Sequence, residues 1–83
     1  MKSGWVFELS KVLANISDTD EMTEFLRGLL TEGELEELAR RVQIVKRLKS
    51  GMAQHTIAKE LGVGVATVTR GSKEIQKGRF IQI

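Results

Sequence analysis

Apolar residues recur every three or four positions along most of the 83-residue chain, which is the spacing of one face of a helix. Valine and isoleucine do not alternate with polar residues over a strand-length run, so strands are not expected. Before residue 50 the pattern predicts three helices, from Trp5 to about Ile16, from after Asp18 to about Leu30, and behind Thr31. The sequence therefore predicts an all-α helical bundle.

Capping residues mark where these helices begin and end. Asp18 is followed three residues later by Glu21, and Thr31 in the same way by Glu34, and both spacings are typical of a capping box. Gly51 follows the last apolar position of the third helix, where a glycine commonly ends a helix. We therefore expect helix starts near residues 19 and 32 and a stop at Gly51.

The third helix is apolar on more than one side. Its main stripe consists of Leu35, Leu38, Val42, Val45 and Leu48. Ala39 and Ile44 widen this stripe, and a helix of this kind usually packs against more than one neighbour. The stripe is interpreted either as plain core or as a dimer seam, and Trp5 likewise as a core residue or a dimer anchor.

Chain length adds weight to the dimer interpretation. A domain of 83 residues buries only about 60–65% of its unfolded surface, so its own core is small. The chain has no cysteine, so neither disulfides nor thiolate metal sites can supply stability. Oligomerisation is the remaining common means, and we expect a homodimer.

The stretch QHTIAKELGVGVATVTRGS, from Gln54 to Ser72, has the spacing of a helix-turn-helix. This motif needs a small residue where its two helices cross and a glycine that adopts positive φ at the corner between them. It also needs apolar residues on the sides of the two helices that face each other. The positions that meet these needs are Ile57, Ala58, Leu61, Gly62, Val63, Val68 and Thr69. The pattern predicts a helix-turn-helix over about residues 53–77, within a single domain of residues 1–83.

Charge is distributed unevenly between the two halves. Residues 1–41 carry a net charge of −4, whereas residues 42–83 carry +6. This asymmetry indicates either a polyanionic partner for the second half or an ordinary solvated face. The outward side chains of the second motif helix are short, which suits close approach to base edges: Val65, Ala66, Thr67, Thr69 and Arg70. The candidate phosphate contacts around them are Lys46, Arg47, Lys49, Lys59 and Lys73.

Other classes of function find little support. The N-terminus has no basic-then-apolar signal pattern and no apolar run is long enough for a membrane span, so we expect a cytoplasmic protein without membrane contact. His55 has no partners at metal-ligand spacing, and Ser72 has no histidine nearby in sequence. Neither a metal site nor an enzyme is expected.

Two blocks resemble the tryptophan operon repressor family. LTEGELEELARRVQIV (Leu30–Val45) resembles the family's long helix, and GVGVATVTRGS (Gly62–Ser72), whose first glycine ends the stretch KELG (Lys59–Gly62), resembles its reading helix. The resemblance implies an all-helical, intertwined homodimer that represses transcription by binding a palindromic operator in double-stranded DNA. It also implies L-tryptophan as a candidate corepressor, which fixes the angle of the reading head.

The resemblance also implies the residues of a ligand pocket. Arg41 and Arg70 match the two arginines that sandwich an indole ring in that family. The full set of matched positions is Gly28, Leu30, Thr31, Arg41, Arg70, Gly71 and Glu74. Glu74 stands where the family has a serine, and it either pairs with a ligand's ammonium or, if it points to solvent, weakens a carboxylate ligand. No counterpart of the family's last helix is matched before Ile83, and a retained pocket of altered affinity is expected.

We expect DNA contacts from both helices of the motif and its turn. The positions are Gln54, His55, Lys59, Gly64, Val65, Ala66, Thr67 and Thr69. Gly62 and Gly64 bracket the turn, so the reading head is expected to be mobile until a ligand fixes it. The alternative is a ligand-independent helix-turn-helix module that organises partner proteins, whose binding need not weaken with salt as phosphate contacts do.

Overall fold

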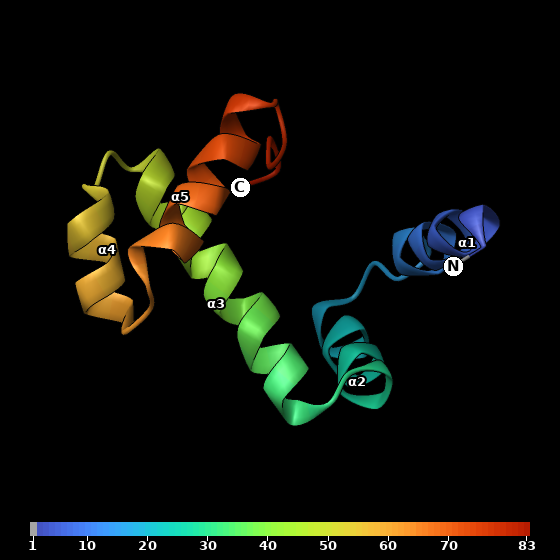
Figure 1. Ribbon diagram of the computed structural model, residues 1–83. Coiled ribbons are helices and arrows are strands. Elements are labelled where there is room, and N and C mark those ends of the chain that lie inside the picture. Colours follow the sequence, from blue (N-terminus) through green and yellow to red (C-terminus); the bar gives the residue numbers. More distant parts are fainter. Residues whose placement is uncertain (1) are drawn as a thin grey trace. The chain divides into compact units, whose positions relative to one another are not determined.

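The computed structural model describes residues 2–83, and all regular structure within them is helical, which confirms the expected fold class. The elements in chain order are α1 (Ser3–Ala14), α2 (Thr19–Leu29), α3 (Glu32–Lys49), α4 (Gln54–Leu61) and α5 (Val65–Gln76) (Figure 1). None of these helices is both long enough and apolar enough to cross a bilayer.

The chain divides into two compact units, Met1–Leu35 and Glu36–Ile83, and the boundary falls in the second turn of α3. We call them the N-terminal and C-terminal units. The expected single domain of residues 1–83 stays a prediction.

Both predicted capping residues of the N-terminal unit are in place. The Asp18 carboxylate accepts a hydrogen bond of 2.9 Å from the backbone N–H of Glu21 at the start of α2. At the start of α3, the Thr31 N–H donates to Glu34 (2.8 Å) and the Glu34 N–H donates to the Thr31 hydroxyl (3.2 Å), as in a capping box. Hydrogen bonding by the Thr31 backbone, and after it by the Thr31 side chain, lowers the pKa of Glu34. A lowered pKa means that this cap stabilises the fold at neutral pH and that its contribution is lost as the pH falls through that pKa.

Helix α1 has no buried residue. Its apolar side chains are largely exposed, with Trp5 at 57% and Phe7 at 67%. Within the N-terminal unit, as residues 2–35 describe it, Trp5 is therefore not a core residue, because its ring is largely exposed there. Its role as a dimer anchor stays a prediction.

The C-terminal unit is held by a small buried cluster from three helices. Ile44 of α3 is 2% exposed, Ile57 and Ala58 of α4 are 0% and 6%, and Val68 of α5 is 0%. Around these four residues, which we call the core cluster, pack Leu48, Met52, Leu61 and Val63. The apolar helix-turn-helix positions thus lie where the spacing predicted. By contrast, α3 buries Ile44 and Val45, whereas Leu38 and Val42 of the expected stripe are each 42% exposed.

Two glycines make the turns that bring α4 and α5 onto α3. Gly51 has φ +91°, and the N–H groups of Gly51 and Met52 bond back to the carbonyls of Leu48 (3.0 Å) and Arg47 (3.1 Å). This is a Schellman end, and it confirms the predicted stop of α3. Gly62 caps α4 in the left-handed region at φ +67°, as the corner of a helix-turn-helix requires. Gly64 is the N-cap of α5 at φ −72°, a backbone conformation that any residue can adopt.

Gly62 and Gly64, which lie on either side of the turn between α4 and α5, provide a matched test of this geometry. A Cβ at either position would meet no atom within 4 Å, so the two changes differ only in backbone conformation. Gly62→Ala should lower the free energy of unfolding by about 1 kcal/mol, because an L-residue is strained at positive φ. Gly64→Ala should change it by only a few tenths of a kcal/mol, because the lower entropy of the unfolded chain offsets the poorer N-cap. Urea denaturation followed by circular dichroism measures both, and equal effects would contradict the assigned turn.

Candidate functional site

The solvent side of α5 is set by its one fully buried residue. Val68 is 0% exposed in the core cluster. Successive helical residues are turned by about 100°, so positions two before and two after Val68 lie on nearly the opposite side. Those positions are Ala66 and Arg70, and both are exposed. Thr67 and Val65, which is 38% exposed, continue this surface at the start of α5.

Two of the expected DNA contacts bond to each other. The Thr69 hydroxyl donates a hydrogen bond of 2.7 Å to the side-chain oxygen of Gln54, and the pair is partly buried. This bond joins the first residue of α4 to the middle of α5. It helps to hold the two motif helices at one angle, which is a structural role for both side chains.

Some of the basic side chains serve the fold of the C-terminal unit. Arg47 of α3 donates to Glu60 of α4 at 2.8 Å and to the Gln43 side chain at 2.8 Å. Lys49 donates to the backbone carbonyls of Phe80 and Ile83. These two candidate phosphate contacts therefore have partners within the unit.

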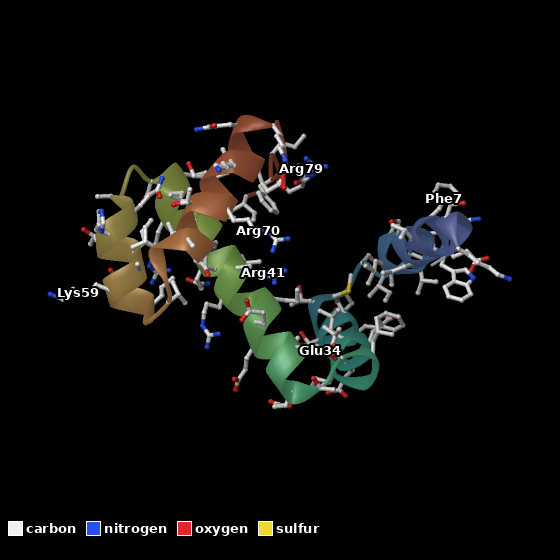
Figure 2. The ribbon with its side chains drawn as sticks, viewed as in Figure 1. Phe7, Glu34, Arg41, Lys59, Arg70 and Arg79 are labelled. Atoms are coloured by element: carbon white, nitrogen blue, oxygen red, sulfur yellow. The ribbon has the colours of Figure 1, made fainter. Side chains whose placement is uncertain are left out.

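Other basic residues remain open to solvent. Lys46, His55, Lys59 and Lys73 are exposed. Within residues 2–83 none of the three lysines has an ion-pair partner. Lys59 extends outward from α4, away from the rest of its unit (Figure 2). These side chains, with Ala66 and its neighbours, form the surface that the sequence assigned to DNA.

A cavity of about 330 Å³ lies between α3 and α5 within the C-terminal unit. Its lining residues are Glu37, Arg41, Ile44, Val45, Thr67, Arg70, Gly71, Glu74, Arg79 and Phe80. Four of the seven expected ligand residues therefore meet here. Arg41 and Arg70 project from α3 and α5 on the same side of this unit (Figure 2).

Gly71 explains how α5 comes so near to α3. A Cβ on Gly71 would lie 3.3 Å from Cγ2 of Ile44 and 3.4 Å from Cδ1 of Leu48, which is closer than side chains normally pack. The absent side chain thus allows the two helices to approach each other. The same packing places Arg70, the residue before Gly71, beside the α3 residues that line the cavity.

The carboxylates of the cavity already have cationic partners. Glu37 accepts from Arg41 and from Arg40, each at 3.3 Å. Both pairs lie along α3 at helical spacing, as expected for these charges. Glu74 is paired with Arg79 at 3.1 Å and with Lys77 at 3.5 Å. Arg70 is thus the one arginine of this lining without a carboxylate partner among residues 2–83.

No sequence pattern pointed to Glu37, Arg79 and Phe80 as cavity residues. The available signal was Gly78, which follows Lys77, the C-cap residue of α5. It has φ +91°, and its N–H bonds to the Ile75 carbonyl at 2.9 Å while the Arg79 N–H bonds to the Glu74 carbonyl at 3.2 Å. This second Schellman end reverses the chain and returns Arg79 and Phe80 to the cavity.

The other three expected ligand residues belong to the N-terminal unit. Gly28 is exposed in α2, Leu30 is the C-cap residue of α2, and Thr31 caps α3 through its hydrogen bonds with Glu34. Their assignment to a ligand stays a prediction.

Comparison with known proteins points to one family. The model of the family described as Trp repressor protein matches residues 5–79. A Trp operon repressor homolog of Aliivibrio salmonicida is 39% identical over 70 residues, which cover 83% of this chain and 65% of the relative. A homolog of the same name from Xylella fastidiosa is 35% identical, and the match covers 82% of this chain and 75% of the relative. Another from Vibrio parahaemolyticus is 36% identical, and the match covers 83% of this chain and 68% of the relative. The chain thus spans less than two thirds of the first of these relatives, and no solved structure matches it.

A double-mutant cycle tests the structural role of the Gln54–Thr69 bond. Gln54→Ala and Thr69→Val should each lower the free energy of unfolding, and the double variant should fall short of their sum by about 1 kcal/mol. Urea unfolding of the four proteins gives this coupling. Strictly additive losses would mean that the two side chains act independently.

Proposed function

The chain belongs to the Trp repressor protein family, and on that premise we propose that it is a homodimeric transcriptional repressor that binds double-stranded DNA through α5. The observation that carries this proposal is the burial of Val68, which leaves Ala66 and Arg70 on the solvent side of a helix-turn-helix. The family is one of regulators and not of enzymes, and we assign no reaction to this chain.

The surface of α5 suits a major groove. Val65, Ala66 and Thr67 are short, so the helix backbone can come near the base edges, and their methyl groups can contact those of thymine. Lys59 and Lys73 stand free to contact phosphates, which position the helix without reading sequence. In a twofold dimer the two α5 helices would read half-sites about one helical turn apart, so the operator would be a palindrome.

Exposed apolar surface supports the homodimer. Leu9 and Val12 of α1 are 42% and 45% exposed, as Leu38 and Val42 of α3 are at 42% each. Monomeric proteins rarely leave so many large apolar side chains in water along two helices. A second copy of the chain would cover them.

The cavity supplies the proposed gate. It lies between α3 and α5, and Arg70 lines it while also lying on the solvent side of α5. A ligand held there, L-tryptophan or a related small molecule, would touch both helices and favour one angle of α5 over others. In this proposal the ligand shifts the DNA affinity through that angle.

The DNA-binding face is tested with Ala66→Asp. Ala66 is exposed, so a carboxylate there should leave the fold intact, but against a phosphate-lined groove it should abolish specific binding. The operator is first obtained by selecting bound DNA from a random pool, with and without L-tryptophan. Fluorescence anisotropy then compares the variants with wild type over a series of salt concentrations.

Gln76→Glu is the matched control, since it adds the same charge at an exposed position near the end of α5 and should retain specific binding. Full specific binding by folded Ala66→Asp would place the reading face elsewhere. Wild-type partner binding that does not weaken with salt would favour the protein-organising module instead.

The homodimer is tested by sedimentation at micromolar concentration, where we expect a dimer. Leu9→Glu places a carboxylate in the apolar side of α1 and should shift the equilibrium towards monomer. Lys11→Glu introduces the same side chain about 200° further round α1 and should leave the dimer in place. A compact wild-type monomer would contradict the proposal.

A further inference from the structure

We propose that residues 78–83 form a lid on the cavity between α3 and α5, and that Lys49 of α3 is the catch that holds this lid closed. The opening of the lid concerns this chain alone, and only its control of ligand entry rests on the proposed ligand gating. Lys49 thereby has a function other than the phosphate contact expected from the sequence.

The lid follows α5 and reaches the cavity through two turns. The chain reverses first at Gly78, whose φ is +91° (Figure 1). It turns again where the Ile83 N–H donates to the Phe80 carbonyl at 3.2 Å. Between the two turns, Arg79 and Phe80 line the cavity together with residues of α3 and α5. The lid is therefore part of the cavity wall.

One side chain of α3 ties the lid to that helix. The Lys49 ammonium donates hydrogen bonds to the carbonyls of Phe80 and Ile83, the second at 2.9 Å. The donor is charged, and such bonds are stronger than those between neutral groups. Lys49 is also exposed, so water can replace both carbonyls as its partners. The catch can therefore close the lid and also release it.

The other contacts of the lid are weak. Phe80 is its one partly buried residue, whereas Ile81 is 80% exposed and Ile83 37%. The Arg79 side chain is 62% exposed, and its pair with Glu74 at 3.1 Å is of the surface kind that contributes little stability. Segments with few buried apolar groups and solvent-exposed hydrogen bonds open locally while the rest of the domain stays folded.

The backbone of Phe80 favours opening once the catch is released. Phe80 has φ +65° and is the one non-glycine residue with positive φ among residues 2–83. A bulky L-residue is strained in this region and keeps such a conformation only where its surroundings impose it. Here the Phe80 carbonyl is held by both Lys49 and the Ile83 N–H. Loss of the Lys49 bond removes part of that restraint, so the strain opposes closure.

Opening of the lid leaves the helix packing in place. No residue of the core cluster, or of the four that pack around it, belongs to the lid. The lid can therefore move Arg79 and Phe80 away from the cavity while α3, α4 and α5 stay packed. A ligand would enter and leave by this movement, at a rate that Lys49 sets.

Amide hydrogen exchange of the protein without ligand, followed by NMR, measures the opening. Lys49→Met keeps the apolar stem but removes the donors, and it should lower the protection of the Arg79 and Ile83 amides about tenfold. The amides of Ile57 and Val68, whose side chains belong to the core cluster, should keep their protection. Unchanged protection of the lid amides, or an equal loss in the core cluster, would overturn the proposal.

Lys46→Met is the matched control, since it removes an exposed lysine three residues earlier in α3 that has no ion-pair partner within residues 2–83. It should leave the lid amides as protected as in the wild type. A loss equal to that in Lys49→Met would mean that the charge of α3, and not the catch, holds the lid.

Gly78→Ala tests the lid without changing Lys49. A Cβ on Gly78 would meet no atom within 4 Å, but an L-residue is strained at φ +91°. The variant should therefore lower the protection of the Ile83 amide about fivefold. Gln82→Ala, at an exposed position of the same segment, should not. An unchanged Ile83 amide in Gly78→Ala would contradict a lid held at this turn.

Ligand entry is measured by ¹⁹F NMR with 5-fluoro-L-tryptophan as the probe. Its dissociation rate should be about tenfold higher from Lys49→Met than from the wild type or Lys46→Met, in line with the tenfold change in opening. Equal rates would overturn the control of entry. No binding by the wild type would overturn both the ligand gating and the control of entry, and the amide exchange would still decide whether residues 78–83 open as a lid.

Discussion

The packing of Ile44 against Ile57, Ala58 and Val68 is the contact on which the C-terminal unit depends. Three of these side chains are at most 2% exposed, and burial of one such aliphatic side chain contributes about 1.5–3 kcal/mol. Few other apolar groups of this unit are removed from water, so the orientation of α4 and α5 on α3 rests on a small number of atoms. The Arg47–Glu60 pair and the Gln54–Thr69 bond add direction to this contact, because both join separate helices.

The candidate site follows from this packing. Burying Val68 turns Ala66 and Arg70 to the solvent side of α5, and the bare Cα of Gly71 lets that helix lie against Ile44. The same approach forms the open cavity between α3 and α5. The proposed surface for reading DNA and the proposed cavity for a small molecule thus share one helix, which is the arrangement that a ligand-dependent regulator needs.

The N-terminal unit presents a different balance. Helices α2 and α3 begin at well-formed caps, but α1 has no side-chain cap and buries none of its apolar side chains. Local hydrogen bonds therefore define much of its secondary structure, while burial of apolar surface within the unit contributes little free energy. These exposed apolar side chains are the physical reason for proposing that the chain acts as a homodimer.

Local features of this protein were determined by the sequence alone. The caps at Asp18 and Thr31, the stop at Gly51 and the corner at Gly62 depend on residues a few positions apart, so spacing and residue type were enough to predict them. Resemblance to a family brought together Arg41, Arg70, Gly71 and Glu74, and they do line one cavity.

Tertiary structure decided which side chains face which. Glu74 could have met a ligand or solvent, and only the turn at Gly78 shows that Arg79 neutralises it and that Phe80 joins the lining. Likewise the same helical spacing buries Ile44 and leaves Trp5 and Val42 in water. The helical spacing of apolar residues predicts that one face of a helix will be covered. What covers that face depends on contacts with residues distant in sequence or in another copy of the chain. The spacing within one helix contains no information about those contacts.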